Sequence, residues 1–86
     1  MSEYKITLSR SAAKEYASIR NIKLLRGINR ILDDIKKDPG QYKKLSGPLA
    51  HLRSARTFSF RILYEVRERE LLVYVVSIDD RKDVYR

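Results

Sequence analysis

Hydrophobic and polar residues alternate most regularly in the last third of the chain, over residues 58–66. The apolar positions of this alternation are Phe58, Phe60, Ile62, Tyr64 and Val66. A period of two is typical of a β-strand with one buried face, so Arg61 faces the other way. Residues 67–70 then form a charged turn, and residues 71–78 return as a strand that is apolar on both faces, as in a central position. The pattern therefore predicts a β-hairpin at the centre of a sheet.

The pairing of the two strands decides which side chains share a face. We expect Val66 to lie opposite Leu71 across the turn. The apolar side chains that then share one face are Phe60, Ile62, Tyr64, Val73 and Val75. This face is where we expect the helices to pack, and Arg61 points away from it.

The pattern of apolar and polar residues in the N-terminal part of the chain predicts a short strand followed by a helix. Residues 4–8 alternate between large or apolar and polar side chains, which indicates an edge strand. Ser9 or Ser11 then caps a helix that continues to about residue 20, with apolar residues at helical spacing. Asn21 is the expected break after this helix.

A second helix is predicted after Asn21. Its apolar stripe consists of Ile22, Leu25, Ile28, Leu32 and Ile35. The sequence Asp38-Pro39-Gly40 ends it, because proline disfavours helical backbone in the preceding residue and glycine tolerates a left-handed exit. The two helices are expected to form an antiparallel pair.

The remaining segments complete the expected fold. Residues 41–48 form a polar connection with Leu45 turned inward, and residues 51–57 form another strand. The predicted fold class is α+β: two N-terminal antiparallel helices pack on one face of a small twisted antiparallel sheet, and a short C-terminal tail or helical turn follows. Because 86 residues support one hydrophobic core, we expect a single domain over residues 1–86.

Composition narrows the class of partner. The net charge of +8 favours an acidic partner, most often nucleic acid, although an anionic membrane or an acidic protein also fits. No apolar run approaches the roughly 20 residues that cross a bilayer, and the first residues do not resemble a signal peptide, so we expect a cytoplasmic protein. With no cysteine and a single histidine, the chain is expected to use no metal and no cofactor.

One set of side chains is a candidate site. Arg56, Arg61, Arg81 and Tyr85 are expected to converge on the sheet face that the helices leave open. Arginine grips a phosphate through parallel hydrogen bonds, so an RNA phosphate is the expected ligand. A single arginine chosen at random is more often solvated surface, and only convergence favours a site. Tyr85 either stacks on a base, exchanges a proton or packs its ring on the sheet.

Further candidates lie in basic stretches nearby. The additional phosphate-binding candidates are Arg53, Lys43, Lys44 and Lys82. His51 is a candidate acid or base because its unperturbed pKa lies near neutrality, although the sequence gives it no partner. Three aspartates, Asp79, Asp80 and Asp83, are interpreted as structural because no neighbouring ligand completes a metal site.

Three segments together resemble the RelE/ParE toxin superfamily of toxin–antitoxin pairs. They are Leu52-Arg53-Ser54-Ala55-Arg56, Phe60-Arg61-Ile62-Leu63-Tyr64 and Asp80-Arg81-Lys82-Asp83-Val84-Tyr85-Arg86, which occur in the order and spacing of the RelE-like pattern. Two sequence differences from close relatives are Phe60 at a frequent tyrosine position and Asp80 where many carry histidine. The family's fold of two helices on a twisted sheet agrees with the fold that periodicity predicts.

The resemblance implies a function and partners. A RelE-like protein is a ribosome-dependent mRNA endonuclease, in which the RNA 2′-hydroxyl attacks the adjacent phosphate without a metal. Arg61 and Arg81 match the positions that stabilise that phosphate, and Tyr85 matches the tyrosine that stacks on or deprotonates the substrate. The implied partners are a cognate RelB-like antitoxin, the ribosome and mRNA. The alternatives are a ParE-like inhibitor of DNA gyrase and a non-catalytic module that acts through its antitoxin complex.

Overall fold

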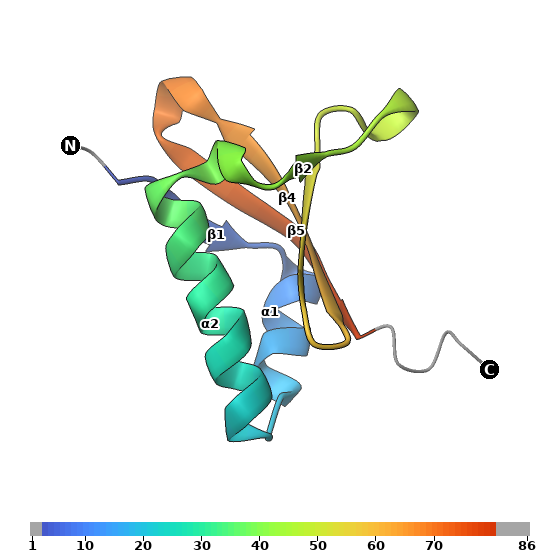
Figure 1. The fold of residues 1–86 in the computed structure, drawn as a ribbon. Helices are drawn as coiled ribbons and strands as arrows, with labels where there is room; N and C mark the ends of the chain where they lie inside the picture. The colour runs from blue at the N-terminus through green and yellow to red at the C-terminus, as the bar shows by residue number, and fades with distance from the viewer. Residues whose placement is uncertain (1–2, 81–86) are drawn as a thin grey trace.

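The computed structural model describes residues 3–80 as two layers, with two helices against one face of a five-stranded sheet (Figure 1). The helices are α1 (Arg10–Ser18) and α2 (Ile22–Lys37). The strands are β1 (Lys5–Leu8), β2 (Lys43–Lys44), β3 (Arg53–Thr57), β4 (Phe60–Arg67) and β5 (Leu72–Asp80), in the spatial order β1-β5-β4-β3-β2. Single 3-10 turns lie at Pro39–Gln41, Gly47–Leu49 and Glu68–Glu70. The predicted α+β fold with two helices on one face is confirmed.

Both helices begin at polar caps that the sequence indicates. The Ser9 hydroxyl accepts a hydrogen bond from the Ala12 backbone N–H at 3.0 Å, and Asn21 Oδ1 accepts from the N–H groups of Lys23 and Leu24 at 2.9 and 3.2 Å. These bonds satisfy backbone donors that the first helical turn leaves unpaired. The α1 and α2 helices lie side by side, and the Tyr16 hydroxyl of α1 donates to Asn29 of α2 at 2.7 Å (Figure 1).

The buried stripe of α2 is rotated relative to the predicted one. Ile28 and Ile35 are fully buried as expected, but Ile22 is 61% exposed because it occupies the first helical position, at the end of the layer. The residues that pack with the two buried isoleucines are Leu24, Ile31 and Leu32. Among helices within residues 3–80, none is long and apolar enough to span a membrane.

The sheet is mixed rather than purely antiparallel, because the edge strand β1 runs parallel to β5. Alternation along a single strand determines its two faces and carries no information about the direction of its neighbour, so the sequence could not distinguish the two arrangements. The sequence also gave no indication of β2, whose two residues pair with β3 within the predicted connection. This strand is too short for a periodic signal.

The predicted register of the β4–β5 hairpin is wrong by two residues. Val66 lies opposite Val73 rather than Leu71. The 3-10 turn at Glu68–Glu70 and the left-handed Leu71, at φ 50°, occupy the positions that the prediction assigned to the start of the returning strand. A shift by an even number of residues keeps every side chain on its expected face, so Tyr64 and Val75 still meet on the helix side.

A β-bulge in β5 changes which side chains face the helices. Leu63 pairs with Ser77 and Tyr64 pairs with Val75, so Val76 is an extra residue. The Ser9 hydroxyl donates to the Val76 carbonyl at 2.6 Å, which links the bulge to the start of α1. Beyond the bulge the alternation is reversed. Ile78 is therefore buried, whereas Asp79 is exposed on the opposite face.

One hydrophobic core lies between the helices and the sheet. Its largest fully buried side chains are Tyr64, Ile28, Ile35, Ile62, Val73 and Val75. The Tyr64 hydroxyl donates to the Pro39 carbonyl at 2.7 Å, so the buried phenol is satisfied and anchors the exit of α2. The other face of the sheet carries no helix and is termed the open face.

Candidate functional site

Two arginines lie side by side on the open face. Arg56 of β3 and Arg61 of β4 are directly opposite partners in the antiparallel register, and Asp79 of β5 lies opposite Arg61 on its other side. Like charges directly opposite each other destabilise a sheet, so this pair is arranged at a cost in stability. An arrangement of this kind is favourable when an anion binds between the two guanidinium groups.

The guanidinium groups of these arginines have few partners in the described part of the chain. The Nε of Arg61 is buried and makes no hydrogen bond to any atom within residues 3–80. The ion pair found in the described residues joins Arg67 to Glu65 at 3.5 Å and involves neither Arg56 nor Arg61. A buried N–H donor without an acceptor costs free energy, and a phosphate oxygen is a suitable acceptor.

A hollow of about 530 Å³ lies beside the arginine pair. Its lining residues are Gln41, Tyr42, Lys43, Leu45, Ser54, Ala55, Arg56 and Arg61. The hollow exists because β2 pairs with β3 only at Ser54 and Arg53, which leaves the edge of β3 uncovered beyond Ser54. We call it the basic hollow, because the charged side chains of its described wall are Lys43, Arg56 and Arg61.

The structure separates Arg53 and Lys44 from the basic hollow. Arg53 pairs with Tyr64, whose ring is on the helix side, and its Nη1 donates to the carbonyls of Tyr42 at 2.8 Å and Gly40 at 3.3 Å. Lys44 pairs with Arg53 and shares its side of the sheet. Arg53 therefore holds the connection after α2 against β3, a structural contact that the sequence did not indicate.

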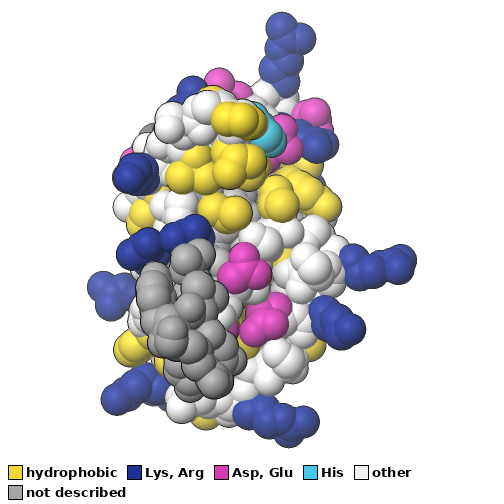
Figure 2. Space-filling view, turned by 90° about the vertical axis from the view of Figure 1, so that its right-hand side faces the viewer, with side chains coloured by type: hydrophobic (Ala, Val, Ile, Leu, Met, Phe, Trp, Pro, Cys, Tyr) yellow, Lys and Arg dark blue, Asp and Glu magenta, His cyan; other side chains and the backbone are white. Residues whose placement is uncertain are grey.

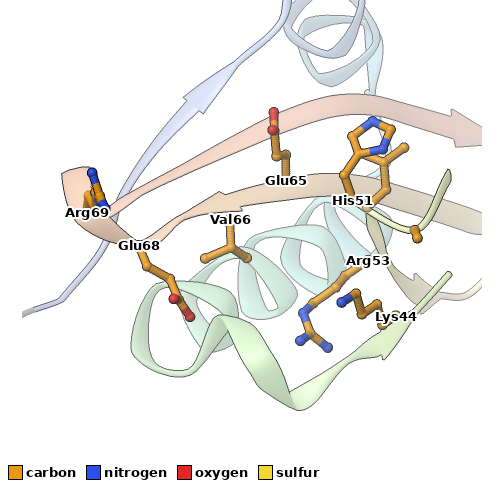
Figure 3. Close-up of a pocket in the computed structure, with 9 residues that line it drawn as sticks. Lys44, His51, Arg53, Glu65, Val66, Glu68 and Arg69 are labelled. Carbon is orange, nitrogen blue, oxygen red and sulfur yellow. The ribbon is translucent and has the colours of Figure 1, made fainter. Parts of the chain in front are cut away.

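Lys44, Arg53 and His51 line a second hollow, of about 440 Å³, near the β4–β5 turn (Figure 3). Its wall also contains Glu65, Glu68 and Arg69, so acidic and basic groups are mixed there. Figure 3 shows Glu65 and Val66 leaving β4 on opposite sides, as their alternation requires. We call this the mixed hollow; His51 lies there, away from the arginine pair.

Two tyrosines near the arginines are held in their neutral form. Burial raises the pKa of Tyr42, as does the carboxylate of Asp34, which accepts the Tyr42 hydroxyl hydrogen bond at 3.4 Å. Burial raises the pKa of Tyr64 to about 12. A phenol whose pKa is raised is a poor base at neutral pH, so neither side chain is suited to accept a proton from a substrate.

Several predicted site residues lie outside the described residues, namely Arg81, Lys82 and Tyr85. At the end of β5, the Ser59 hydroxyl donates to Asp80 Oδ1 at 2.7 Å. This bond gives Asp80 the structural role that the sequence suggested. No cluster of three or more His, Cys, Asp or Glu side chains that would suit a metal occurs within residues 3–80.

The open face combines apolar and charged regions (Figure 2). Hydrophobic side chains gather on its upper half, acidic side chains lie near its centre, and lysine and arginine side chains project around its rim. The sequence did not single out Tyr42, Gln41 or Ser54 as lining residues, because they approach the arginines only through the pairing of β2 with β3. Phe58, which the alternation places among the apolar positions, is 62% exposed at the β3–β4 turn.

Comparisons with known proteins identify the family of this chain. A family described as the ParE toxin of the type II toxin–antitoxin system, parDE, matches residues 6–85. No curated protein matches the chain. Among solved structures, a chain of the RelBE2 toxin–antitoxin complex from Mycobacterium tuberculosis is 23% identical with a TM-score of 0.80, and the alignment covers 94% of each chain.

Two further structures have the same fold. A chain of the intact E. coli RelBE toxin–antitoxin complex is 18% identical with a TM-score of 0.76, over 90% of this chain and 95% of that one. A YoeB/ParE toxin from Agrobacterium tumefaciens is 22% identical with a TM-score of 0.77, over 88% of this chain and 96% of that one. Because the family match spans nearly the whole sequence, the chain belongs to the ParE toxin family and is a toxin of the RelE/ParE superfamily of type II toxin–antitoxin systems.

Proposed function

We propose that this toxin is a ribosome-dependent mRNA endonuclease that holds a phosphate of the message at Arg56 and Arg61. The observation that carries the proposal is the arginine pair itself, with the unpartnered Arg61 Nε beside a hollow whose described charged groups are all basic. Two guanidinium forks on adjacent strands suit the non-bridging oxygens of one phosphodiester.

The proposed reaction is an internal transfer at phosphorus that uses no metal. The 2′-oxygen of a ribose attacks the adjacent phosphate, the bond to the 5′-oxygen of the next nucleotide breaks, and a cyclic phosphate and a free 5′-hydroxyl result. Arg61 would stabilise the negative charge that grows on the phosphate oxygens. Arg81 is proposed to share this role, and Tyr85 to stack on the substrate or take the proton of the 2′-hydroxyl.

The other basic candidates have different proposed roles. Lys43, which lines the basic hollow, would attract the RNA backbone beside the reacting phosphate. The same role was predicted for Arg53, but its guanidinium group is already bonded to two carbonyls, so we expect it to act by supporting the loop that carries Tyr42 and Lys43. His51 lies in the mixed hollow, which makes it a weaker candidate for proton transfer to this phosphate.

We propose an antitoxin as the physiological partner. The structurally similar RelE chains from E. coli and Pyrococcus horikoshii were solved in complex with RelB. An acidic or amphipathic segment would complement the apolar upper half of the open face and the basic side chains around its rim (Figure 2). Binding to ribosomes and mRNA implies a cytoplasmic location.

A second candidate function is inhibition of DNA gyrase. It is favoured by the family match, because that family is described as the ParE toxin. A gyrase inhibitor would act by binding, without a need for the arginine pair to contact RNA. The two candidates therefore differ in target and in their dependence on Arg61.

The deciding experiment compares the purified toxin on both targets. Cleavage of mRNA in translating ribosomes is measured for the wild type and for Arg61→Ala, Arg81→Ala and Tyr85→Phe, alongside supercoiling by purified gyrase. We expect the wild type to cut ribosome-bound mRNA and each variant to cut more slowly. If the mRNA stayed intact and supercoiling were blocked, the toxin would be an inhibitor of DNA gyrase instead.

A further inference from the structure

The β3–β4 turn presents an aromatic ring to solvent. Phe58 is 62% exposed and has a left-handed backbone, at φ 54°, which bulky side chains rarely adopt. A strained backbone of this kind persists only where the surrounding structure holds it, and such residues cluster at ligand sites. Among the described residues other than glycine, one more combines a left-handed backbone with an exposed apolar side chain. This residue is Leu71, at the opposite end of the sheet, with φ 50° and 41% exposure.

The ring of Phe58 is held in place by contacts on both sides of the turn. A Cβ atom added at Gly27 of α2 would lie 2.7 Å from Cε2 of Phe58 and 2.8 Å from Oγ1 of Thr57. Gly27 is therefore the residue that allows the ring to lie directly on the helix. The Ser59 hydroxyl bond to Asp80, at 2.7 Å, fixes the turn to the end of β5. Contacts of this kind orient the ring before a ligand binds, which lowers the entropy that binding costs.

Basic side chains border this ring on two sides. Lys23 and Arg30 are exposed on α2 one helical turn before and after Gly27, so they lie on the same side of the helix. Arg56 precedes Phe58 by two residues, but its side chain is on the open face, whereas the ring lies on α2 beside Gly27. An aromatic ring between cations is the arrangement with which proteins bind single-stranded nucleic acid.

Asp79 is exposed on the open face opposite Arg61, and the other carboxylates near the turn have contacts of their own or lie farther away. Asp80 accepts the Ser59 hydrogen bond. Asp34 of α2 accepts a hydrogen bond from the Tyr42 hydroxyl and is seven residues beyond Gly27, about 10 Å along the helix axis. Among the described residues, the charge beside the ring is therefore predominantly positive along α2, whereas on the open face Asp79 accompanies the two arginines.

We propose that Phe58 is a stacking platform for a base of single-stranded RNA whose phosphate is held at Arg56 and Arg61. The RNA strand would leave the open face at the end of β4, pass over the β3–β4 turn and continue toward Lys23 and Arg30 of α2. This inference rests on the proposed action on RNA and adds a binding subsite outside the basic hollow. Because every base has an aromatic face, the subsite would contribute affinity with little sequence preference.

The test uses glycine substitutions at the two left-handed positions. Glycine removes the side chain at Phe58 or Leu71 and relieves the backbone strain at the same time, so neither variant is expected to lose thermal stability. Binding of the full-length protein to a fluorescein-labelled single-stranded RNA is measured by fluorescence anisotropy. We expect Phe58→Gly to weaken binding about tenfold and Leu71→Gly to leave it unchanged.

Two conservative variants separate stacking from general apolar contact. Phe58→Tyr keeps the aromatic face and should bind RNA as the wild type does, whereas Phe58→Leu should lose about as much affinity as Phe58→Gly. Quenching of an aminopurine base in the same RNA reports stacking directly, and we expect it in the wild type and in Phe58→Tyr only.

Several results would overturn the inference. Equal weakening by Phe58→Gly and Leu71→Gly, or full affinity in Phe58→Leu, would show that the ring does not act by stacking. Wild-type affinity in Phe58→Gly together with weakened binding in Arg61→Ala would reject this subsite alone and leave the proposed function standing. If the wild type bound no free RNA, this subsite would be rejected, and the proposed function would still be decided by cleavage of mRNA on translating ribosomes. A loss of gyrase or antitoxin binding by Phe58→Gly without a loss of RNA binding would assign the ring to a protein partner.

Discussion

The two ends of the sheet, at the β3–β4 turn and at the β4–β5 turn, differ in how charge is distributed (Figure 1). Each end has an exposed apolar side chain and a hollow. The described charged groups of the basic hollow are Lys43, Arg56 and Arg61. The mixed hollow combines Lys44, His51, Arg53 and Arg69 with Glu65 and Glu68. Near the second end, Arg67 also lies over the Tyr74 ring, 5.7 Å from its centroid, and pairs with Glu65 at 3.5 Å.

This difference shows that net charge by itself does not locate a site. The charge of +8 belongs to the whole chain, and arginines occur at both ends of the sheet. At the mixed end the basic groups have acidic neighbours, so an anion there would meet repulsion as well as attraction. At the basic end Arg61 lies between Arg56 and Asp79, and an anion on the Arg56 side would relieve the repulsion between the two arginines.

The largest effect is expected from removing one arginine at the basic end. Arg61→Ala should lower the rate of mRNA cleavage about a hundredfold or more, because it removes a donor to the charge that grows on the phosphate. Arg69→Ala, at the mixed end, removes the same charge and should leave the rate nearly unchanged. Single-turnover cleavage on ribosomes measures both. Equal losses would mean that total charge, rather than its position, determines activity.

A substitution in the middle of β4, between the two ends of the sheet, should lower stability and leave the charge at both ends unchanged. Tyr64→Phe removes the donor to the Pro39 carbonyl and leaves that acceptor unsatisfied, so we expect a loss of about 1–2 kcal/mol in the free energy of unfolding. Urea unfolding at neutral pH measures this loss. The folded variant should bind RNA as the wild type does.

The same substitution tests the raised pKa of Tyr64. The ordinary value for tyrosine is 10.0, and burial raises the pKa of Tyr64 to about 12. The unfolded phenol ionises first, so wild-type stability is complete below the unfolded pKa and falls as pH rises toward 12, by up to about 2–3 kcal/mol. Tyr64→Phe lacks this loss, so the two stability curves should converge with rising pH. If the free energies of unfolding of the two proteins stayed parallel with rising pH, burial would not raise the pKa of Tyr64.

A smaller effect is expected from the contact between α2 and the basic end. Gly27→Ala would push the Phe58 ring aside, because the new Cβ would lie 2.7 Å from it, and we expect RNA binding to weaken a few-fold. In a Phe58→Gly background the same change should not affect RNA binding, and its gain of about 1 kcal/mol from helix propensity should be reduced by the remaining 2.8 Å contact of the new Cβ with Thr57 Oγ1. A double-mutant cycle with both readouts measures this coupling. Additive effects on binding would show that the ring is not positioned by Gly27.

The smallest effect is expected at the mixed end. Glu65→Gln breaks the 3.5 Å pair with Arg67, which is largely exposed, so the free energy of unfolding should change by less than about 0.5 kcal/mol. It also removes one negative charge from the mixed hollow, which should make RNA binding slightly stronger at low salt. Thermal unfolding and anisotropy at two salt concentrations measure these changes. A large loss of stability would show that the mixed end is a structural network rather than a solvated surface.

Features that depend on a few neighbouring residues could be predicted from the sequence. The helix caps at Ser9 and Asn21 and the end of α2 at Asp38 follow from side-chain and backbone chemistry within one helical turn. The two faces of β4 follow from its alternation, which is why Arg61 was expected on the open face. The resemblance to the superfamily, which rests on short segments, was confirmed by the match over residues 6–85.

Features that depend on distant segments could not be predicted. The parallel pairing of β1, the two-residue strand β2 and the bulge at Val76 each require a partner strand that the local pattern does not identify. The bulge shows the limit most clearly. Strict alternation from Val75 would place Asp79 in the core, and only the extra residue turns it outward, opposite Arg61.

The sequence by itself determined the composition of the open face, because side-chain period and charge are properties of the chain. Tertiary structure alone decided how its basic residues are grouped. Strand register placed Arg56 directly opposite Arg61. Alternation along β3 puts Arg53 on the other side, and the fold supplies the Tyr42 carbonyl to which it donates. The packing of α2 left room at Gly27 for the Phe58 ring. Register and helix packing are set by contacts across the core, so they become defined only when the whole domain has folded.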